Sequence, residues 1–171
     1  VYINLQYGVT QTYTSTPGDR FGTLLRRIFL ATLTIELLGA LALFSVELER
    51  LPLAQAAWYA IFHSISAFCN AGFSLHRDNL IPFQTDPFYL GVIDLLIIFG
   101  GLGFIVLHNL ITTKFWRRNL MTRGRVSLHS KIALSATLLL IAAGALVFLC
   151  AEWNNTLKDL PLLDKFTCSI F

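Results

Sequence analysis

The chain has 171 residues, of which 55% are hydrophobic and only 13% charged, and its mean hydropathy is +0.64. Soluble domains carry about 25% charged residues, so the composition excludes an ordinary soluble domain and predicts an integral membrane protein. The net charge is only +3, which makes the placement of the charges more informative than their sum. Val1 is not a starting methionine and Phe171 interrupts a pattern, so we expect a fragment of a longer protein.

Three stretches have the roughly 20 apolar residues that a membrane-spanning helix requires. They cover about 28–46, 88–110 and 132–151. Single carboxylates, Glu36 and Asp94, lie in the first two. An intramembrane acid is a functional candidate by default. A hydrogen-bonded interior acid is the more ordinary interpretation, and neither residue is assigned to a site.

Residues 54–68, between the first two spans, predict a helix of about half a span. Pro52 suits the first turn of such a helix, where its missing N–H costs no hydrogen bond. The stretch SAFCNAGFSL (66–75) follows, with a glycine among polar and small residues. A short helix and an extended return predict a re-entrant hairpin, which is stable at membrane depth only when protein or a water-filled cavity covers it.

The basic residues support this topology, because nine of the thirteen lie in two clusters, residues 20–27 and 114–131. Lys and Arg gather on the cytoplasmic side of a membrane. Both clusters lie on that side only if the hairpin between the first two spans does not cross the membrane. The run 114–131 also interleaves aromatic residues, as nucleic-acid-binding segments do, but its position predicts a cytoplasmic loop that contacts anionic lipid or an acidic regulatory subunit. No nucleic-acid partner is expected.

A cation site is predicted where the short helix ends. The helix dipole places its negative end there, and extended backbone can turn its carbonyls toward an ion in place of the hydration shell. The expected ligands are the carbonyls of Cys69, Asn70, Ala71 and Gly72, with glycine supplying φ above zero or close approach. The side chains of Cys69 and Asn70 are expected to pack behind the loop. One loop cannot surround an ion, so several such units must meet around an axis.

A repeat with a period of 109 residues is also visible. The segment DKFTCSIF follows the third span as AAWYAIF follows the first, and Phe171 aligns with Phe62. The repeating unit is a span, a short helix, an extended loop and a second span. The same register places another glycine about ten residues past Phe171.

Cysteine, histidine and glycine give no second site. The three cysteines, Cys69, Cys150 and Cys168, form no CxxC pair, so neither zinc binding nor a disulfide framework is indicated, and buried apolar roles are expected. The four histidines share no metal-ligand spacing and are given structural roles: His63, His76, His108 and His129. Three glycines lie within a span with no following lysine, which indicates close helix packing, or a hinge, rather than a phosphate loop: Gly100, Gly101 and Gly103.

Four ordered motifs resemble the Trk/Ktr/HKT superfamily of potassium transporters, in particular the bacterial Ktr-type membrane subunit. FHSISAFCNAGFSL (62–75) resembles its second pore loop, and GGLGFIV (100–106) the second helix of that repeat. SLHSKIAL (127–134) and EWNN (152–155) resemble the two ends of the next helix. The resemblance covers about residues 20–171, and Cys69 stands where the family often has Asn.

The resemblance implies a channel-like pore of four fused helix–loop–helix units, of which this chain holds the second and the start of the third. K⁺, or Na⁺ in some members, passes into the cell across the cytoplasmic (inner) membrane, with the ion held at Asn70, Ala71 and Gly72. The implied partners are a cytoplasmic nucleotide-binding regulatory subunit and a second copy of the full-length protein. No organic cofactor and no enzymatic activity are implied. The corresponding segments are 1–27 (cytoplasmic connection), 28–110 (complete repeat, with pore helix and filter at about 52–75), 111–131 (basic cytoplasmic loop) and 132–171 (truncated next repeat).

Three alternatives stay open at this point. A sodium-conducting member of the same superfamily would share every motif. A secondary transporter holds Na⁺ and substrate at broken helices, but it predicts an inverted repeat, whereas this repeat keeps one direction. An intramembrane hydrolase would use Ser64, Ser66 or Ser74 with a nearby histidine, yet no nucleophile motif surrounds them.

Overall fold

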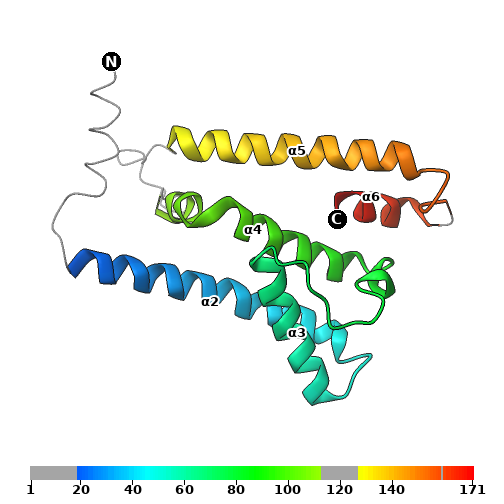
Figure 1. Cartoon of the computed structure of the whole chain (residues 1–171), viewed down its shortest axis with the longest axis horizontal. Helices are drawn as coiled ribbons and strands as arrows, with labels where there is room; N and C mark the ends of the chain where they lie inside the picture. The colour runs from blue at the N-terminus through cyan, green and yellow to red at the C-terminus, as the bar shows by residue number, and fades with distance from the viewer. Residues whose placement is uncertain (1–18, 113–126, 159) are drawn as a thin grey trace, which may run out of the picture. The chain divides into compact units, whose positions relative to one another are not determined.

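The computed structural model describes residues 19–112, 127–158 and 160–171, and every regular element in these ranges is helical (Figure 1). The elements are α2 (Asp19–Glu47), α3 (Leu53–Phe68), the 3-10 helix η1 (Ile81–Phe83), α4 (Pro87–Thr112), α5 (Leu128–Glu152) and α6 (Leu162–Ile170). The chain divides into two units between Thr34 and Ile35, and the packed core lies in the second. Most of the expected cytoplasmic connection (1–27) and of the expected basic loop (111–131) lies outside the described residues.

Three of the described helices are long and apolar enough to cross a membrane, over Leu25–Glu47, Pro87–Phe104 and Leu128–Glu152. Their apolar surface is mostly not covered by the chain itself: on α5, Leu138, Leu139 and Leu140 are all about 70% exposed. A soluble monomer rarely exposes an apolar surface of this extent, whereas lipid tails solvate it well. The predicted all-α membrane class, with three spans, is therefore confirmed.

The helix α3 is too short to cross a bilayer. Its 16 residues extend about 24 Å at 1.5 Å per residue, against a hydrocarbon thickness of about 30 Å. Pro52 precedes it with φ −57° and ψ 148°. Small side chains on its buried face, such as Ala60 and Ala67, allow it to lie against α4. The expected short helix is present, and its re-entrant placement in a membrane stays a prediction.

The hydrophobic core gathers residues from the end of α2, from α3, from η1 and from the first half of α4. Its buried members are Leu43, Ala60, Ala67, Phe83, Tyr89, Leu90, Ile93 and Leu96. The rings of Phe83 and Tyr89 stack with their centroids 3.8 Å apart. The Arg50 guanidinium lies 4.3 Å from the centroid of the Phe83 ring and donates a hydrogen bond to the Pro82 carbonyl. These contacts hold the connection between the loop after α3 and the start of α4.

The first turn of α4 is capped by Asp86. The Asp86 carboxylate accepts the backbone N–H of Tyr89 at 3.0 Å, and its carbonyl accepts that of Leu90 at 3.1 Å. Pro87, the first helical residue, has no N–H to satisfy. An aspartate before a proline is thus a local sequence signal for the start of this helix.

Two glycines shape the second half of α4. At Gly100 an added Cβ would lie 1.8 Å from the carbonyl oxygen of Phe68, so the close approach of α4 to the end of α3 requires glycine. Gly103 has φ +74° and ψ 159°, which interrupts the helical backbone. Close packing explains Gly100, as expected, and the break at Gly103 is a local basis for the hinge interpretation.

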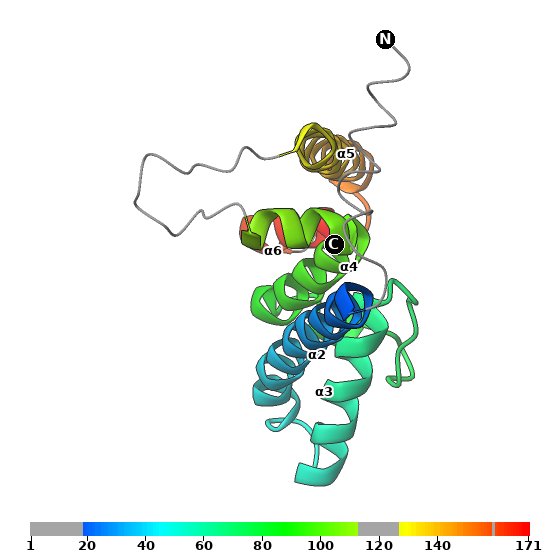
Figure 2. The ribbon, with the colours of Figure 1, turned by 90° about the vertical axis from the view of Figure 1, so that its left-hand side faces the viewer.

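The last helix, α6, follows α5 as α3 follows α2, and it contacts both α4 and α5 (Figure 1 and Figure 2). Pro161 precedes it with φ −63° and ψ 158°, close to the values at Pro52. Pro161 lies 109 residues after Pro52, the same offset that relates Phe171 to Phe62. The repeat stays a prediction, now supported by matching backbone geometry.

Candidate ion site in the loop after α3

The chain leaves α3 through a Schellman motif in which Asn70 takes the left-handed position, with φ +54°. The Asn70 N–H donates to the Ala67 carbonyl at 3.0 Å, and the Ala71 N–H donates to the Ser66 carbonyl at 2.9 Å. This pair of hydrogen bonds defines the motif and satisfies two carbonyls at the helix end. Asn is one of the few residues other than glycine that adopts this backbone readily, so the turn itself explains Asn70.

Gly72 is the second left-handed residue of the loop, with φ +71°. A Cβ at this position would meet no atom within 4 Å. Glycine is therefore required by the backbone conformation and not by lack of space. Two left-handed residues within three positions give this loop a conformation that ordinary L-residues avoid.

The side chain of Ser66 holds the far end of the loop. Its hydroxyl donates to the Phe73 carbonyl at 2.8 Å and accepts the Phe73 N–H at 3.0 Å. The Ser66 carbonyl also accepts the N–H of Ala71. One residue of α3 thus fastens the loop on both sides of Gly72.

The four predicted ligand residues follow one another directly at the C-terminal end of α3, and all four are exposed. Within the described parts of the chain, none of the carbonyls of residues 69–72 accepts a hydrogen bond. A cavity of about 240 Å³ borders the loop and is lined in part by Asn70, Gly72 and Ile97. The negative end of the α3 dipole adds to a site suited to a cation. The assignment of these carbonyls as ion ligands stays a prediction.

The prediction that the cysteines are buried is wrong: Cys69 and Cys150 are exposed and Cys168 is partly exposed. All three are free. Cys150 lies on α5, whose apolar surface is left uncovered by the chain, and Cys69 lies in the exposed loop. The Asn70 side chain does turn back toward the helix end, with its Nδ2 3.5 Å from the Phe68 carbonyl oxygen.

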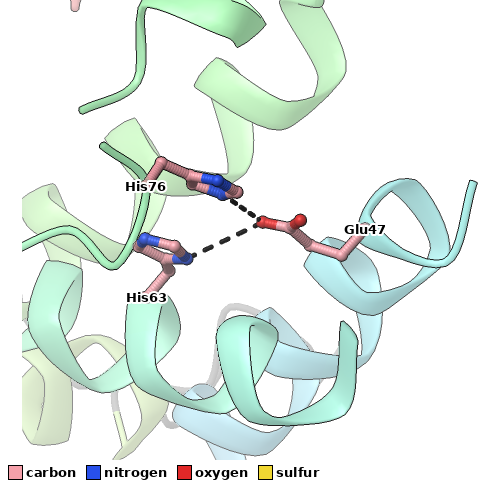
Figure 3. A group of neighbouring side chains, drawn as sticks. All are labelled: Glu47, His63 and His76. Atoms are coloured by element: carbon pink, nitrogen blue, oxygen red, sulfur yellow. Dashed lines mark hydrogen bonds and ion pairs between the residues drawn. The ribbon is translucent and has the colours of Figure 1, made fainter. Parts of the chain in front are cut away.

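A buried cluster of polar side chains lies beside the loop, which the sequence did not predict (Figure 3). The Glu47 carboxylate, at the end of α2, is fully buried. Its Oε1 atom lies 2.9 Å from His76 Nε2 and accepts the Tyr89 hydroxyl at 2.8 Å. The rings of His63 and His76 are stacked, with centroids 5.0 Å apart and an interplanar angle of 4°.

The hydrogen bonds determine the tautomer of His63. Its Nε2 accepts the backbone N–H of Leu75 at 3.2 Å and lies 3.1 Å from the Ser74 hydroxyl. The proton of the neutral ring must then sit on Nδ1, which faces Glu47 Oε1 at 3.7 Å and the Tyr89 hydroxyl at 3.4 Å. Burial, followed by the neighbouring His76, lowers the pKa of His63, while Glu47 opposes the shift. A neutral His63 is consistent with this pKa.

Glu47, His63 and His76 also have the composition of a metal site, since their ligand atoms all lie within 4.8 Å of one another. A metal on His63 Nδ1 would leave the ring proton on Nε2. That proton would face the N–H of Leu75, which is itself a donor. The donor set therefore fits a hydrogen-bonded network better than a metal.

Sequence reasoning missed this cluster because its members come from three segments. His63 and His76 lie 13 residues apart, and Glu47 belongs to another helix. One signal was present. By its spacing, His63 shares one face of α3 with three alanines, Ala56, Ala60 and Ala67, and an alanine-lined face predicts that His63 is buried.

The other polar candidates are not brought into the loop. Glu36 and Asp94 are partly buried on α2 and α4, and neither lines the cavity beside the loop. His129 is exposed near the start of α5, and the His108 side chain lies outside the described part of the chain.

Comparison with known proteins agrees with the motifs. Potassium/sodium uptake protein NtpJ of Enterococcus hirae is 40% identical over 121 residues, which cover 71% of this chain and 25% of that protein. Ktr system potassium uptake protein B of Bacillus subtilis is 37% identical over 150 residues, covering 86% and 32%. The protein of the same name from Vibrio alginolyticus is 36% identical over 132 residues, covering 77% and 28%.

The chain therefore spans only a quarter to a third of the length of these relatives. Residues 20–162 match the family TrkH, described as a cation transport protein. That match includes α3, the loop after it and all of α4. The expected resemblance to the Trk/Ktr superfamily and its Ktr-type membrane subunit is confirmed, and this chain belongs to the TrkH family of cation transport proteins.

Proposed function

We propose that this chain is part of a channel-like protein that takes K⁺ into the cell across the cytoplasmic (inner) membrane. The carbonyls of Cys69, Asn70, Ala71 and Gly72 supply one quarter of its selectivity filter. The relatives are named as potassium or potassium/sodium uptake proteins, and they are long enough to contain further units of the same kind.

The observation that carries the proposal is the conformation of the loop after α3. The left-handed turn at Asn70 ends α3, Gly72 is the second left-handed residue of the loop, and Ser66 fastens the far end of the loop. The carbonyls of residues 69–72 accept no hydrogen bond from the described residues. Carbonyl dipoles held in this way can replace the water around a monovalent cation.

Two alternatives differ in the ion and in the mechanism. A sodium-conducting protein would use the same loop, and the name of the Enterococcus hirae relative includes both ions. A secondary transporter with broken helices predicts an inverted repeat. Pro52 and Pro161 instead precede short helices that each follow a long one in the same order, which favours the channel-like pore.

The proposed partners are a second copy of the full-length protein and a cytoplasmic nucleotide-binding subunit. Two of the three relatives reported above are named as parts of a Ktr system, which supports a multicomponent assembly. The basic loop expected at 111–131 is the segment that we propose for contact with that subunit or with anionic lipid.

The experiment is ion uptake by the full-length protein in cells that lack their own K⁺ uptake, with Gly72→Ser. We expect the K⁺-over-Na⁺ uptake ratio to fall roughly tenfold, because an L-residue in left-handed backbone costs about 1–2 kcal/mol. Gly91→Ser is the matched control, because Gly91 is helical and has open space around it. An unchanged ratio at a normal protein level would remove Gly72 from the filter.

A further inference from the structure

We propose that Glu47, His63, His76 and Tyr89 form a buried anchor that positions the filter loop and thereby sets its ion selectivity. This inference rests on the proposed function of the loop. None of the four residues is proposed to touch the ion. They act through the backbone that follows Gly72, and they are positioning residues.

The segment that leaves the filter is held at each of its four residues. Phe73 is bound through both its N–H and its carbonyl by Ser66. Ser74 lies with its hydroxyl 3.1 Å from His63 Nε2 and accepts the N–H of His76. The Leu75 N–H donates to His63, and the His76 ring pairs with Glu47. Without the side chains of Ser66, His63 and Glu47, the polar groups of residues 73–76 would have to hydrogen-bond to water.

His63 connects this segment to the rest of the cluster. One ring nitrogen accepts from the loop backbone, and the other faces Tyr89 and Glu47. His63 is only 2% exposed, so bulk water does not readily replace either partner. Loss of either ring nitrogen is therefore expected to shift the backbone of the loop.

Glu47 is the point at which four segments meet. It ends α2, contacts His63 of α3 and His76 of the loop, and accepts from Tyr89 in the first turn of α4. Its Oε2 atom is buried and has no hydrogen-bond partner in the described chain. Burying a carboxylate with an unpaired oxygen is unfavourable. A purely structural core position would be filled better by an apolar residue, so a buried acid here points to a positioning role.

The ring-nitrogen assignment gives a matched pair of variants in the full-length protein. In His63→Gln the side-chain oxygen can occupy the place of Nε2 and accept the Leu75 N–H. In His63→Asn the amide reaches only the place of Nδ1. Two quantities are measured: the K⁺-over-Na⁺ uptake ratio, and amide hydrogen exchange over residues 73–76, which needs no transport.

For His63→Asn we expect the uptake ratio to fall roughly tenfold and exchange over residues 73–76 to accelerate, because a buried N–H loses its acceptor. His63→Gln should stay within roughly threefold of the wild type in both. Ser64→Ala is the control: Ser64 is buried on the same helix, but its hydroxyl donates to the Glu36 carbonyl and not to the loop. Both quantities should be unchanged in it.

Three outcomes would overturn the anchor. Equal behaviour of the Asn and Gln variants would refute the role of Nε2. Faster exchange with an unchanged uptake ratio would reduce the cluster to a structural one. If amide hydrogen exchange over residues 73–76 slows only when Zn²⁺ is added to chelator-treated protein, the cluster is a metal site and not a hydrogen-bonded network. A wild-type protein without preference for K⁺ would instead refute the proposed function, while the exchange comparison would still decide whether the loop is anchored.

Discussion

Gly100 of α4 faces the carbonyl of Phe68, the last residue of α3, so closely that an added Cβ would lie 1.8 Å from the carbonyl oxygen. The contact is with backbone, which cannot rotate away as a side chain can. It also lies at the point where α3 ends and the filter loop begins. The packing of α4 and the position of the proposed filter are therefore coupled through one glycine.

Gly100→Ala is expected to destabilise the full-length protein by about 3 kcal/mol, the upper end of the usual cost of overpacking. The neighbouring Gly101→Ala is its control, because a Cβ there would be 3.9 Å from the nearest atom, the Asn70 amide nitrogen. The melting temperature of the purified protein in detergent measures the difference. Equal melting temperatures would show that α4 does not approach α3 this closely.

Gly39→Ala tests a second close approach with a softer neighbour. A Cβ on Gly39 would lie 2.7–2.8 Å from the two terminal methyl carbons of Leu96 and 2.8 Å from the Ser64 hydroxyl. Side-chain ends can move, so we expect a cost of about 1–2 kcal/mol, less than at Gly100. Combining Gly39→Ala with Leu96→Ala should cost less than the sum of the two single changes. Strict additivity in the same thermal assay would refute the contact.

Ser66→Ala removes both hydrogen bonds that fasten Phe73. Two backbone groups then lose their partner, and each unsatisfied group costs about 1–3 kcal/mol when buried. We expect faster hydrogen exchange at Phe73 and a lower K⁺-over-Na⁺ uptake ratio. Ser45→Ala is the matched control, because the Ser45 hydroxyl donates to the Ala42 carbonyl on an exposed stretch of α2. An exchange rate at Phe73 equal to that of the control would contradict the role of Ser66.

Asp86→Ala should destabilise the start of α4 by about 1 kcal/mol, because the Tyr89 N–H loses its cap. Asp86→Asn keeps an oxygen in the capping position and should cost much less. The two melting temperatures separate capping from charge. If the Asn variant is as unstable as the Ala variant, the carboxylate charge matters more than the cap.

The helices were predictable because their signals are local. A run of apolar residues long enough to cross a bilayer identifies α2, α4 and α5, and Pro52 with a following half-length helix identifies α3. The position of Gly72 in a loop after that helix also follows from order along the chain. None of these inferences needs knowledge of which side chains meet in space.

The buried cluster was not predictable in the same way. A cluster of Glu47, His63 and His76 forms only when the fold brings together the end of α2, α3 and the loop. Ser66 was considered only as a weak nucleophile candidate, although it binds the backbone on the far side of Gly72. For Asn70 the sequence indicated a ligand carbonyl, but not the left-handed turn that the residue makes. The periodicity of apolar residues predicts helices, but it does not predict contacts between segments that are distant in the sequence.

The 109-residue repeat predicts which residue stands in the next loop. Pro52 and Pro161 are 109 residues apart and have nearly the same backbone angles, with φ −57° and −63°. If α6 begins a second pore helix, the same offset from Gly72 falls ten residues past Phe171, and a glycine should stand there. Reading the coding DNA beyond this segment is the measurement. A glycine in that register, after a continued helix, would establish a second loop of the same kind. A β-branched residue there would contradict the repeat, because such a residue rarely adopts the left-handed backbone that this loop requires.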